Sequence, residues 1–219
     1  MIRRDSASLP GFTGSWCIFS TSQISDLHDF QNLDGVHGRG GLIQAGNFIL
    51  RPYRRGGFAR HFNKSTYMCY SRFKREYEIH SALWEAGFPT VEPVGYAYKR
   101  HFWGVEGVYI TKLASALPWP NTWDNNTSSE QIKQIVTLIT SLSEWGLWSP
   151  DMNATNILID ISGQILALDW DKAKWSRKDL LKQKYWQRLK RSMFKLNASK
   201  NLVNSLQQEL IGENDEPQT

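Results

Sequence analysis

The stretch "SPDMNATNILIDISGQILALDWDKAKW", residues 149–175, joins an amide-rich front to an apolar run and then to two aspartates on either side of a tryptophan. The segments "NILID" and "QILALDW" flank "ISG", a tight turn, and therefore predict a short hairpin. Asp151 and Asn156 lie on the loop before this hairpin, and Asp169 lies at its end. The sequence thus predicts that polar side chains from two loops come together beside a small apolar element.

The spacing from Asp151 to Asn156 is D-x-x-x-x-N, the core of the catalytic loop of protein kinases. In that loop the Asp orients the acceptor hydroxyl and accepts its proton, and the Asn holds a metal ion. A hairpin after Asn156 returns Asp169 to the same place, where its carboxylate can bind Mg²⁺ that bridges the phosphates. Taken alone, the six-residue pattern also fits turn and capping residues ahead of a hairpin.

A kinase also needs a strand cation for the phosphates and a helix Glu that holds this cation. The segment "GLIQAGNFILRPY" predicts a hairpin with "AGN" as its turn, and Arg51 near its end occupies the position of the kinase lysine. A helix is predicted from about Ser71 to Ala86, with Glu76 as the partner of Arg51 and with Arg75 and Glu78 as rivals. Arginine keeps a permanent charge but is larger than lysine, so the geometry must differ from that of the lysine.

The remaining segments complete an α+β fold of two lobes, similar to that of protein kinases. "VEPVGYAYKR" and "GVYITKL" predict strands, "ALPWPNTWDNNTSS" predicts a connector at a lobe boundary, and "SSEQIKQIVTLITSLSEWG" predicts a helix that ends at Gly146. We expect an N-lobe over residues 1–113, with an antiparallel sheet and one helix. The C-lobe, residues 114–219, is expected to be small and mainly helical, with the catalytic hairpin.

Composition limits the classes of partner and compartment. Lys and Arg number 26 against 21 Asp and Glu, and this net charge of +5 favours an anionic partner such as a nucleotide, a nucleic acid or an acidic membrane. Cys17 and Cys69 lie far apart and outside any C-x-x-C pattern, so the sequence predicts neither a disulfide framework nor a zinc site. No apolar run approaches the ~18 residues of a spanning helix, and no Sec-type signal is evident. A reducing cytosol is the simplest expectation.

A basic helix is predicted within Lys172–Lys195, where ten basic residues accompany one acid. Its apolar face comprises Leu181, Tyr185, Leu189 and Met193 at a spacing of four. This face predicts packing on the core. The opposite, basic face is either solvated or binds anionic lipid and the phosphates of a lipid acceptor.

Four segments together resemble the lipopolysaccharide kinases of Gram-negative bacteria, most closely the 3-deoxy-D-manno-octulosonic acid (Kdo) kinases: "GRGG…FILRPYRRGGF", "REYEIHSALWEAGFPTVEPVGYAY", "PDMNATNILI" and "LALDWDKAKW". The resemblance covers roughly Gly38 to Trp175. It implies a small protein-kinase-like fold, ATP and Mg²⁺ as cofactors, and phosphorylation of the 4-hydroxyl of Kdo on Kdo-lipid A. It also implies a peripheral protein at the cytoplasmic face of the inner membrane.

The resemblance assigns roles to particular residues. Asp151 is the catalytic Asp, Asn156 and Asp169 are the metal ligands, and Asn153 and Asp171 are auxiliary groups. The nucleotide-binding set is Gly38, Gly40, Gly41, Arg51, Glu76, Thr111 and Leu113. The expected acceptor or membrane contacts are Arg54, Arg55, Arg60, Lys182, Arg188 and Arg191. The chain departs from the family at Ser149, where the family commonly has a His two residues before the catalytic Asp.

Three alternatives remain open at this point. A kinase for another sugar or a small molecule, of the heptose or aminoglycoside type, has the same motifs, although the basic tail favours a lipid-linked acceptor. A catalytically inactive, nucleotide-binding scaffold is suggested by Ser149 and by the lack of a full G-x-G-x-x-G. A nucleic-acid-binding protein fits the basic charge, but the sequence has no zinc-finger spacing or RNP-like motif, so no nucleic acid is expected.

Overall fold

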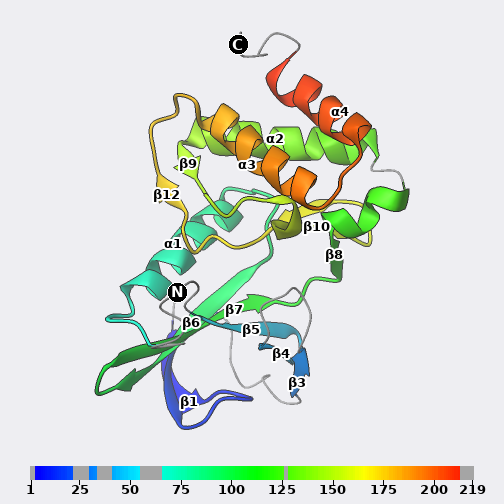
Figure 1. Cartoon of the computed structure of the whole chain (residues 1–219). Coiled ribbons are helices and arrows are strands. Elements are labelled where there is room, and N and C mark those ends of the chain that lie inside the picture. The colour runs from blue at the N-terminus through cyan, green and yellow to red at the C-terminus, as the bar shows by residue number, and fades with distance from the viewer. Residues whose placement is uncertain (1–2, 22–29, 34–40, 55–65, 126–127, 213–219) are drawn as a thin grey trace. The chain divides into compact units, whose positions relative to one another are not determined.

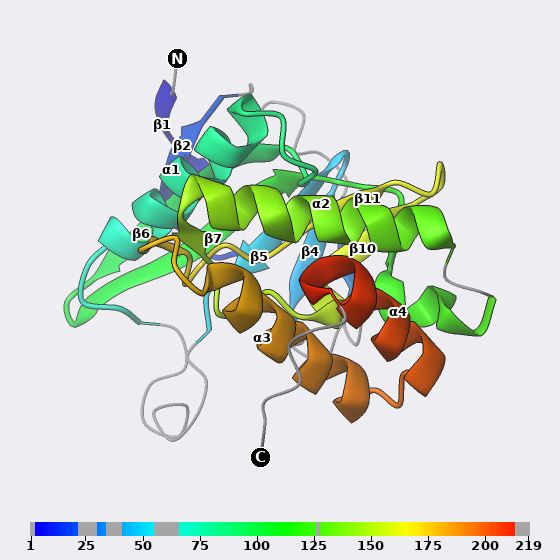
Figure 2. The same cartoon turned by 90° about the horizontal axis from the view of Figure 1, so that it is seen from above.

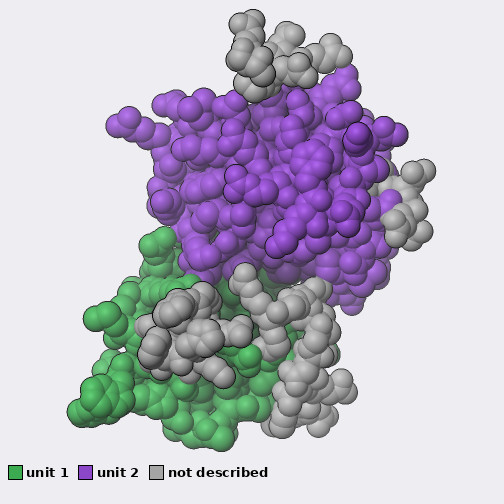
Figure 3. Space-filling model, in the orientation of Figure 1, with its two compact units in different colours: residues 1–82, 91–113 green, residues 83–90, 114–219 purple. Residues whose placement is uncertain are grey.

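The computed structural model describes residues 3–21, 30–33, 41–54, 66–125 and 128–212. The chain divides into two compact units (Figure 3). The first unit comprises Met1–Ala82 and Val91–Leu113, and the second comprises Leu83–Thr90 and Ala114–Thr219. The short segment Leu83–Thr90 thus belongs with the C-terminal half of the chain. Four residues with expected roles lie outside the described residues: Gly38, Gly40, Arg55 and Arg60.

The first unit is built on a seven-stranded antiparallel sheet in the order β1-β2-β6-β7-β5-β4-β3 (Figure 1). The hairpin predicted around "AGN" is confirmed as the pair β4–β5, and the two later predicted strands are the long hairpin β6–β7. The strand bounds are β1 Arg3–Ser8, β2 Ser15–Ser20, β3 Phe30–Leu33, β4 Leu42–Ala45, β5 Phe48–Pro52, β6 Pro93–His101 and β7 Gly104–Lys112.

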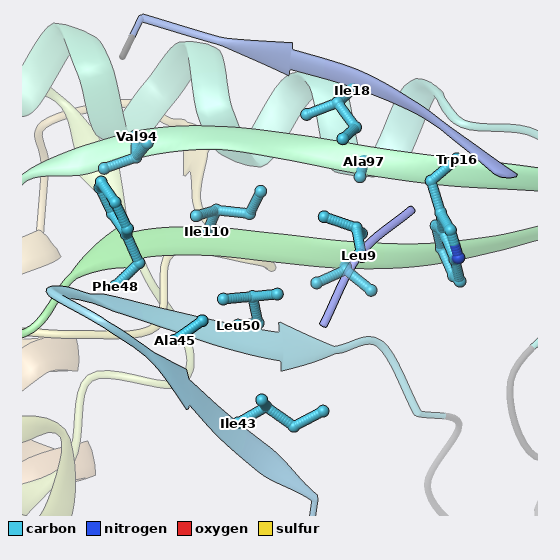
Figure 4. Packing of buried hydrophobic residues seen from close by; sticks show 11 residues of the cluster. Leu9, Trp16, Ile18, Ile43, Ala45, Phe48, Leu50, Val94, Ala97 and Ile110 are labelled. Carbon is cyan, nitrogen blue, oxygen red and sulfur yellow. The ribbon is translucent and has the colours of Figure 1, made fainter. Parts of the chain in front are cut away.

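Alternation along the strands gives this sheet two different apolar faces. One face carries mainly aliphatic side chains, among them Ile18, Leu50 and Ile110 (Figure 4). The other face carries tyrosines, including Tyr96 and Tyr109, because every second residue of β6 and β7 points to that side. The central strands of the sheet are therefore buried on both faces.

Helix α1, Ser71–Glu85, covers the tyrosine face through Phe73 and Tyr77. The helix is confirmed at almost the bounds predicted from the sequence. Phe73 is fully buried, and its ring lies directly against Gly107 of β7, where any side chain would collide with it. The close approach of helix and sheet brings the middle of α1, with Glu76, against the end of β5.

Three helices dominate the second unit: α2 Ser129–Trp145, α3 Leu181–Lys195 and α4 Lys200–Ile211, and they contact one another (Figure 2). Ser128 caps α2 by accepting the backbone N–H of Gln131, and Gly146 ends the helix, as predicted. The apolar face predicted for α3 is confirmed, because Leu181, Tyr185, Leu189 and Met193 are all buried. Helix α4 was not predicted.

The predicted hairpin is present as β10, Ile157–Asp160, and β11, Ile165–Ala167. Its turn is held by the Asp160 carboxylate, which accepts bonds from the N–H groups of Ser162 and Gln164 and from the Ser162 hydroxyl. A third strand, β8 Ala116–Pro118, pairs with β10, and a two-residue pair joins β9 Leu147–Trp148 to β12 Lys174–Trp175.

The segment predicted as a plain connector is in fact ordered structure. It forms β8 and then the 3-10 helix η3, Trp119–Asn125. Trp119 is fully buried in the second unit, so burial of this large ring overrides the turn-forming composition of the segment. No helix among the described residues is both long enough and apolar enough to span a bilayer.

The α+β class and the elements expected of each half are confirmed: an antiparallel sheet with one helix in the first unit, and helices with a short hairpin in the second.

Candidate active site

The loop between β9 and β10 holds Asp151 by hydrogen bonds from side chains to its backbone carbonyl. The side-chain amides of Asn153 and Asn156 both donate to the Asp151 carbonyl, at 2.8 and 2.7 Å. The Asn153 Oδ1 accepts the backbone N–H of Thr155 at 3.0 Å and so caps a single 3-10 turn, η4 Ala154–Asn156. Asn153 is therefore a capping residue that shapes the loop, and this cap is compatible with a catalytic role for Asp151.

The second predicted aspartate lies next to this loop. The backbone N–H of Leu168 donates to the Asn156 carbonyl at 2.8 Å, so Asn156 and Asp169 are neighbours across the hairpin. Asp169 has a φ of 67°, a left-handed conformation that Asp tolerates better than most residues. The following residue, Trp170, is fully buried and donates its indole N–H to Thr90 Oγ1 at 3.0 Å. The buried ring fixes the chain on one side of Asp169, and the hairpin fixes it on the other.

The donor set at this place fits Mg²⁺. Because the Asn156 amide nitrogen is engaged with Asp151, the Asn156 Oδ1 is the end of this side chain that remains to act as a ligand. An amide oxygen and the carboxylate of Asp169 are hard oxygen donors of the type that Mg²⁺ prefers. Among the described residues no group of three or more His, Cys, Asp and Glu side chains gathers as a metal site. One or two protein ligands completed by substrate phosphates are the usual arrangement for Mg²⁺ in kinases.

A cation that the sequence analysis did not single out contacts the catalytic candidate. The Lys172 ammonium lies 2.9 Å from Oδ2 and 3.2 Å from Oδ1 of Asp151. The Asp151 side chain is 15% exposed and that of Lys172 is 55% exposed, so the carboxylate is held from its open side. The signal for this contact was present in "LDWDK", but only the fold shows that Lys172 reaches back to Asp151.

Helix α3 anchors the loop that carries Asp151 at two points. The buried hydroxyl of Tyr185 accepts the backbone N–H of Ser149 at 2.9 Å and donates to the Leu147 carbonyl at 2.8 Å. About two helical turns further on, Ser192 Oγ accepts the backbone N–H of Ala154 at 3.0 Å. These bonds fix the chain on both sides of Asp151. They act where the family His is replaced by Ser149, whose side chain is fully buried.

In the first unit Arg51 forms an ion pair with Glu76, and the Tyr53 hydroxyl donates to the second oxygen of the same carboxylate. Glu76 is 1% exposed, whereas the Arg51 side chain is 31% exposed. The rival Glu78 is more than half exposed and pairs with Lys74 at 3.4 Å. A buried carboxylate therefore holds an arginine whose outer part faces solvent, as a phosphate-binding cation requires.

The aromatic residues around this ion pair are held neutral. The guanidinium of Arg51 lies 5.3 Å from the ring centroid of Tyr53 and 5.5 Å from that of Tyr109. Burial, and next the charge of Glu76, raises the pKa of both tyrosines well above its usual value. His80 Nδ1 lies 2.8 Å from the Tyr109 hydroxyl, and burial lowers the pKa of His80 to about 3. Arg51 thus keeps its charge among aromatic side chains that are neutral and beside a carboxylate that balances it.

The other predicted residues are placed as follows. Gly41 lies against the guanidinium of exposed Arg54, with no room for a side chain between them. Thr111 pairs with Ile49 in the sheet, and the Leu113 N–H bonds the Asn47 carbonyl at 2.8 Å. Asp171 is partly buried beside Trp170 in the chain.

On α3 the predicted basic contacts differ in exposure. Arg191 is exposed, but Lys182 and Arg188 are partly buried. Lys190 is used within the unit, since its ammonium contacts Gln207 of α4 at 3.3 Å and lies over the ring of Trp186. The basic face is therefore narrower than the sequence pattern indicates.

These features are those of a phosphotransferase of the kinase type: a carboxylate on a D-x-x-x-x-N loop, an Asp at the end of the following hairpin, and a strand cation held by a helix Glu. The chain matches the sequence profile of the lipopolysaccharide kinase (Kdo/WaaP) family over residues 36–209, and it belongs to this family.

Two relatives named as Kdo kinases agree with this assignment. The chain is 28% identical to the 3-deoxy-D-manno-octulosonic acid kinase of Xylella fastidiosa (strain M12), over 77% of this chain and 71% of the relative. It is 32% identical to the protein of the same name in Mannheimia succiniciproducens, over 68% of this chain and 66% of that protein. A solved structure, the Cydia pomonella Granulovirus kinase PK-1, aligns with a TM-score of 0.47 and 12% identity, over 68% of this chain and 54% of that one.

Proposed function

We propose that the protein uses ATP to phosphorylate the 4-hydroxyl of Kdo on Kdo-lipid A in lipopolysaccharide core biosynthesis. The observation that carries this proposal is the arrangement around Asp151. Its carboxylate contacts Lys172, its backbone carbonyl accepts the Asn156 amide, and Asn156 is in turn the neighbour of Asp169 across the hairpin. This set is found in a chain of the lipopolysaccharide kinase family, and its relatives named Kdo kinases align over most of its length.

Each residue has a defined part in the transfer. Asp151 accepts a hydrogen bond from the acceptor hydroxyl and takes its proton as the hydroxyl oxygen attacks the γ-phosphorus of ATP. The bond between this phosphorus and the β,γ-bridging oxygen breaks, and ADP leaves. Arg51, held by Glu76, binds nucleotide phosphates. Asn156 and Asp169 hold Mg²⁺, which when bound neutralises charge on the phosphate oxygens. Gly41, Thr111 and Leu113 complete the nucleotide-binding set.

We further propose that the protein works at the cytoplasmic side of the inner membrane as a peripheral protein. The basic face of α3, with Lys182, Arg188 and Arg191, and the net charge of +5 support attraction to an anionic surface. Arg54 is a candidate contact for the carboxylate or phosphates of the acceptor, because guanidinium groups bind such anions in pairs of hydrogen bonds.

An acceptor panel tests the specificity. ADP release from Mg-ATP is measured with Kdo-lipid A, with a heptose-containing core acceptor and with an aminoglycoside, in detergent and with Asp151→Asn as the inactive control. We expect turnover with Kdo-lipid A alone. Turnover with another acceptor would move the assignment to that sugar. ATP binding without turnover on any acceptor would support the scaffold alternative.

A further inference from the structure

Two large aromatic side chains form the tip of the β6–β7 hairpin. Phe102 is 91% exposed and Trp103 is 83% exposed. His101 and Gly104 are partners across the two strands, so the two rings constitute the turn itself. Turns of this length normally hold Gly, Asn, Asp, Ser or Pro, which favour the required backbone. Phe102 and Trp103 bury almost no surface at this place, and departures from local rules concentrate at functional sites.

The hairpin presents these rings on a rigid support. Its strands are nine residues long each, and Val105 also forms a two-way bridge with Tyr67, with N···O distances of 2.7 and 2.8 Å. Met68, the next residue, is 93% exposed and adds a third apolar side chain near the tip. The two rings contact each other edge to face, with centroids 4.8 Å apart. The end of the hairpin extends past the other described strands of the first unit (Figures 1 and 2).

The charges beside the tip suit an anionic surface. Arg100 is exposed and lies two residues before Phe102, and Lys99, whose ammonium donates to the Thr13 carbonyl at 2.9 Å, precedes it. The acidic side chain of this region, Glu106, contacts His101 at 3.1 Å. Trp and Phe at the level of lipid headgroups, with Arg and Lys beside them, are the usual composition of a membrane-interface anchor. Lysine is depleted in the cores of protein interfaces, so Lys99 beside the tip favours a bilayer as the partner.

We propose that Phe102, Trp103 and Met68 insert into the headgroup region of an anionic bilayer and hold the first unit at its surface. This membrane tip is distinct from the basic face of α3. The inference deepens the proposed function, because a lipid-linked acceptor requires an enzyme at the membrane, but it makes a claim about lipid binding that needs no reaction. Each ring transferred from water is expected to strengthen binding by about tenfold or more.

Sedimentation of the full chain with vesicles tests the proposal. Vesicles of phosphatidylethanolamine and phosphatidylglycerol, without ATP and without Kdo-lipid A, are compared across the wild type, Phe102→Ser/Trp103→Ser and a control. The control is Ile161→Ser, since Ile161 is 93% exposed in the β10–β11 turn of the second unit. We expect the double variant to bind on the order of 100-fold more weakly, at about tenfold for each ring, and the control to bind as the wild type does.

Two further measurements separate this proposal from its rivals. Trp103→Phe keeps an apolar ring, so it should still sediment with vesicles but lose most of the fluorescence quenching by brominated lipid. Phosphoryl transfer from ATP to a water-soluble Kdo oligosaccharide should be equal in the wild type and the double variant. Loss of this transfer in both proteins would therefore show that the proposed function is wrong, without bearing on the vesicle binding. Wild-type vesicle binding by the double variant would overturn the proposal. The proposal would also be overturned if the wild type did not bind vesicles but formed a dimer that the double variant does not form. The rings would then belong to a protein interface.

Discussion

The hydroxyl of Tyr185 makes two hydrogen bonds to the segment that leads into the Asp151 loop, and Tyr185→Phe removes both without changing the ring. The ring keeps its contact with Trp148, at 4.8 Å between centroids. The fully buried Ser149 N–H then loses its partner, and the Leu147 carbonyl loses a donor. A buried donor left without a partner costs about 1–3 kcal/mol. We expect a loss of about 2 kcal/mol, which lowers the Tm of a chain of this size by about 4–8 °C.

The same change should slow the reaction. Asp151 follows Ser149 by two residues, so a loop released at Ser149 displaces the carboxylate from the acceptor hydroxyl. Small displacements of a catalytic group cost up to about 100-fold in rate, and we expect kcat to fall by about 10-fold with little change in KM for ATP. Thermal unfolding and steady-state ADP release measure the two effects.

The matched control is Tyr70→Phe, because Tyr70 is 37% exposed and stacks on Tyr98 in the first unit. It should leave both Tm and kcat unchanged. Ser192→Ala, which removes the second anchor, should act in the same direction as Tyr185→Phe. Wild-type stability and turnover in Tyr185→Phe would refute the reasoning, since the hydroxyl would then not hold the loop.

Three further predictions follow from the ion pairs and from the buried histidine. Arg51→Met leaves Glu76 as a buried charge without its cation, and the free energy of unfolding measured with denaturant should drop by about 3 kcal/mol. The double variant Arg51→Met/Glu76→Gln should recover most of this stability. An equal loss of stability in the single and the double variant would refute the pairing. Between pH 6.5 and about 3, His80 binds a proton in the unfolded state but not in the folded state. The free energy of unfolding should therefore decrease as the pH is lowered through this range, by up to about 1.4 kcal/mol per pH unit. His80→Gln should lack this component, and an unchanged slope in the variant would contradict the prediction. Lys172→Met should lower kcat by about 10-fold, because the Asp151 carboxylate is then no longer held in place. The Tm should stay nearly unchanged, because a half-exposed ion pair adds little stability. Lys172→Arg should restore part of the rate, and an unaffected kcat in Lys172→Met would show that the contact is incidental.

The local elements could be predicted because their signals are local. Helix α1 follows from apolar residues at helical spacing and from Gly87, and the hairpin β10–β11 follows from two apolar runs around a turn. The pairing of Arg51 with Glu76 was predicted by analogy with kinases. The choice between Glu76 and Glu78 required the fold, because both lie on the same helix and only burial distinguishes them.

The supports of the site could not be predicted, because they join residues far apart in the sequence. Tyr185 and Ser149 are 36 residues apart, and Lys172 and Asp151 are 21 apart. Helix α3 was interpreted through its basic face, and its apolar positions were assigned to packing in general. The structure shows that one of these positions, Tyr185, carries a hydroxyl that binds the catalytic loop. Exposure at the β6–β7 tip could not be predicted either, because the apolar letters of "HFWG" do not show whether these side chains are buried.

The measurement that tests the central claim most directly is mass spectrometry of Kdo-lipid A after incubation with the purified protein and Mg-ATP in detergent. The wild type and Asp151→Asn are compared, and fragmentation locates the added group. The account predicts one added phosphate on the 4-position of the Kdo with the wild type and none with Asp151→Asn. Unmodified Kdo-lipid A with a folded, ATP-binding wild type, or equal phosphorylation by Asp151→Asn, would contradict it.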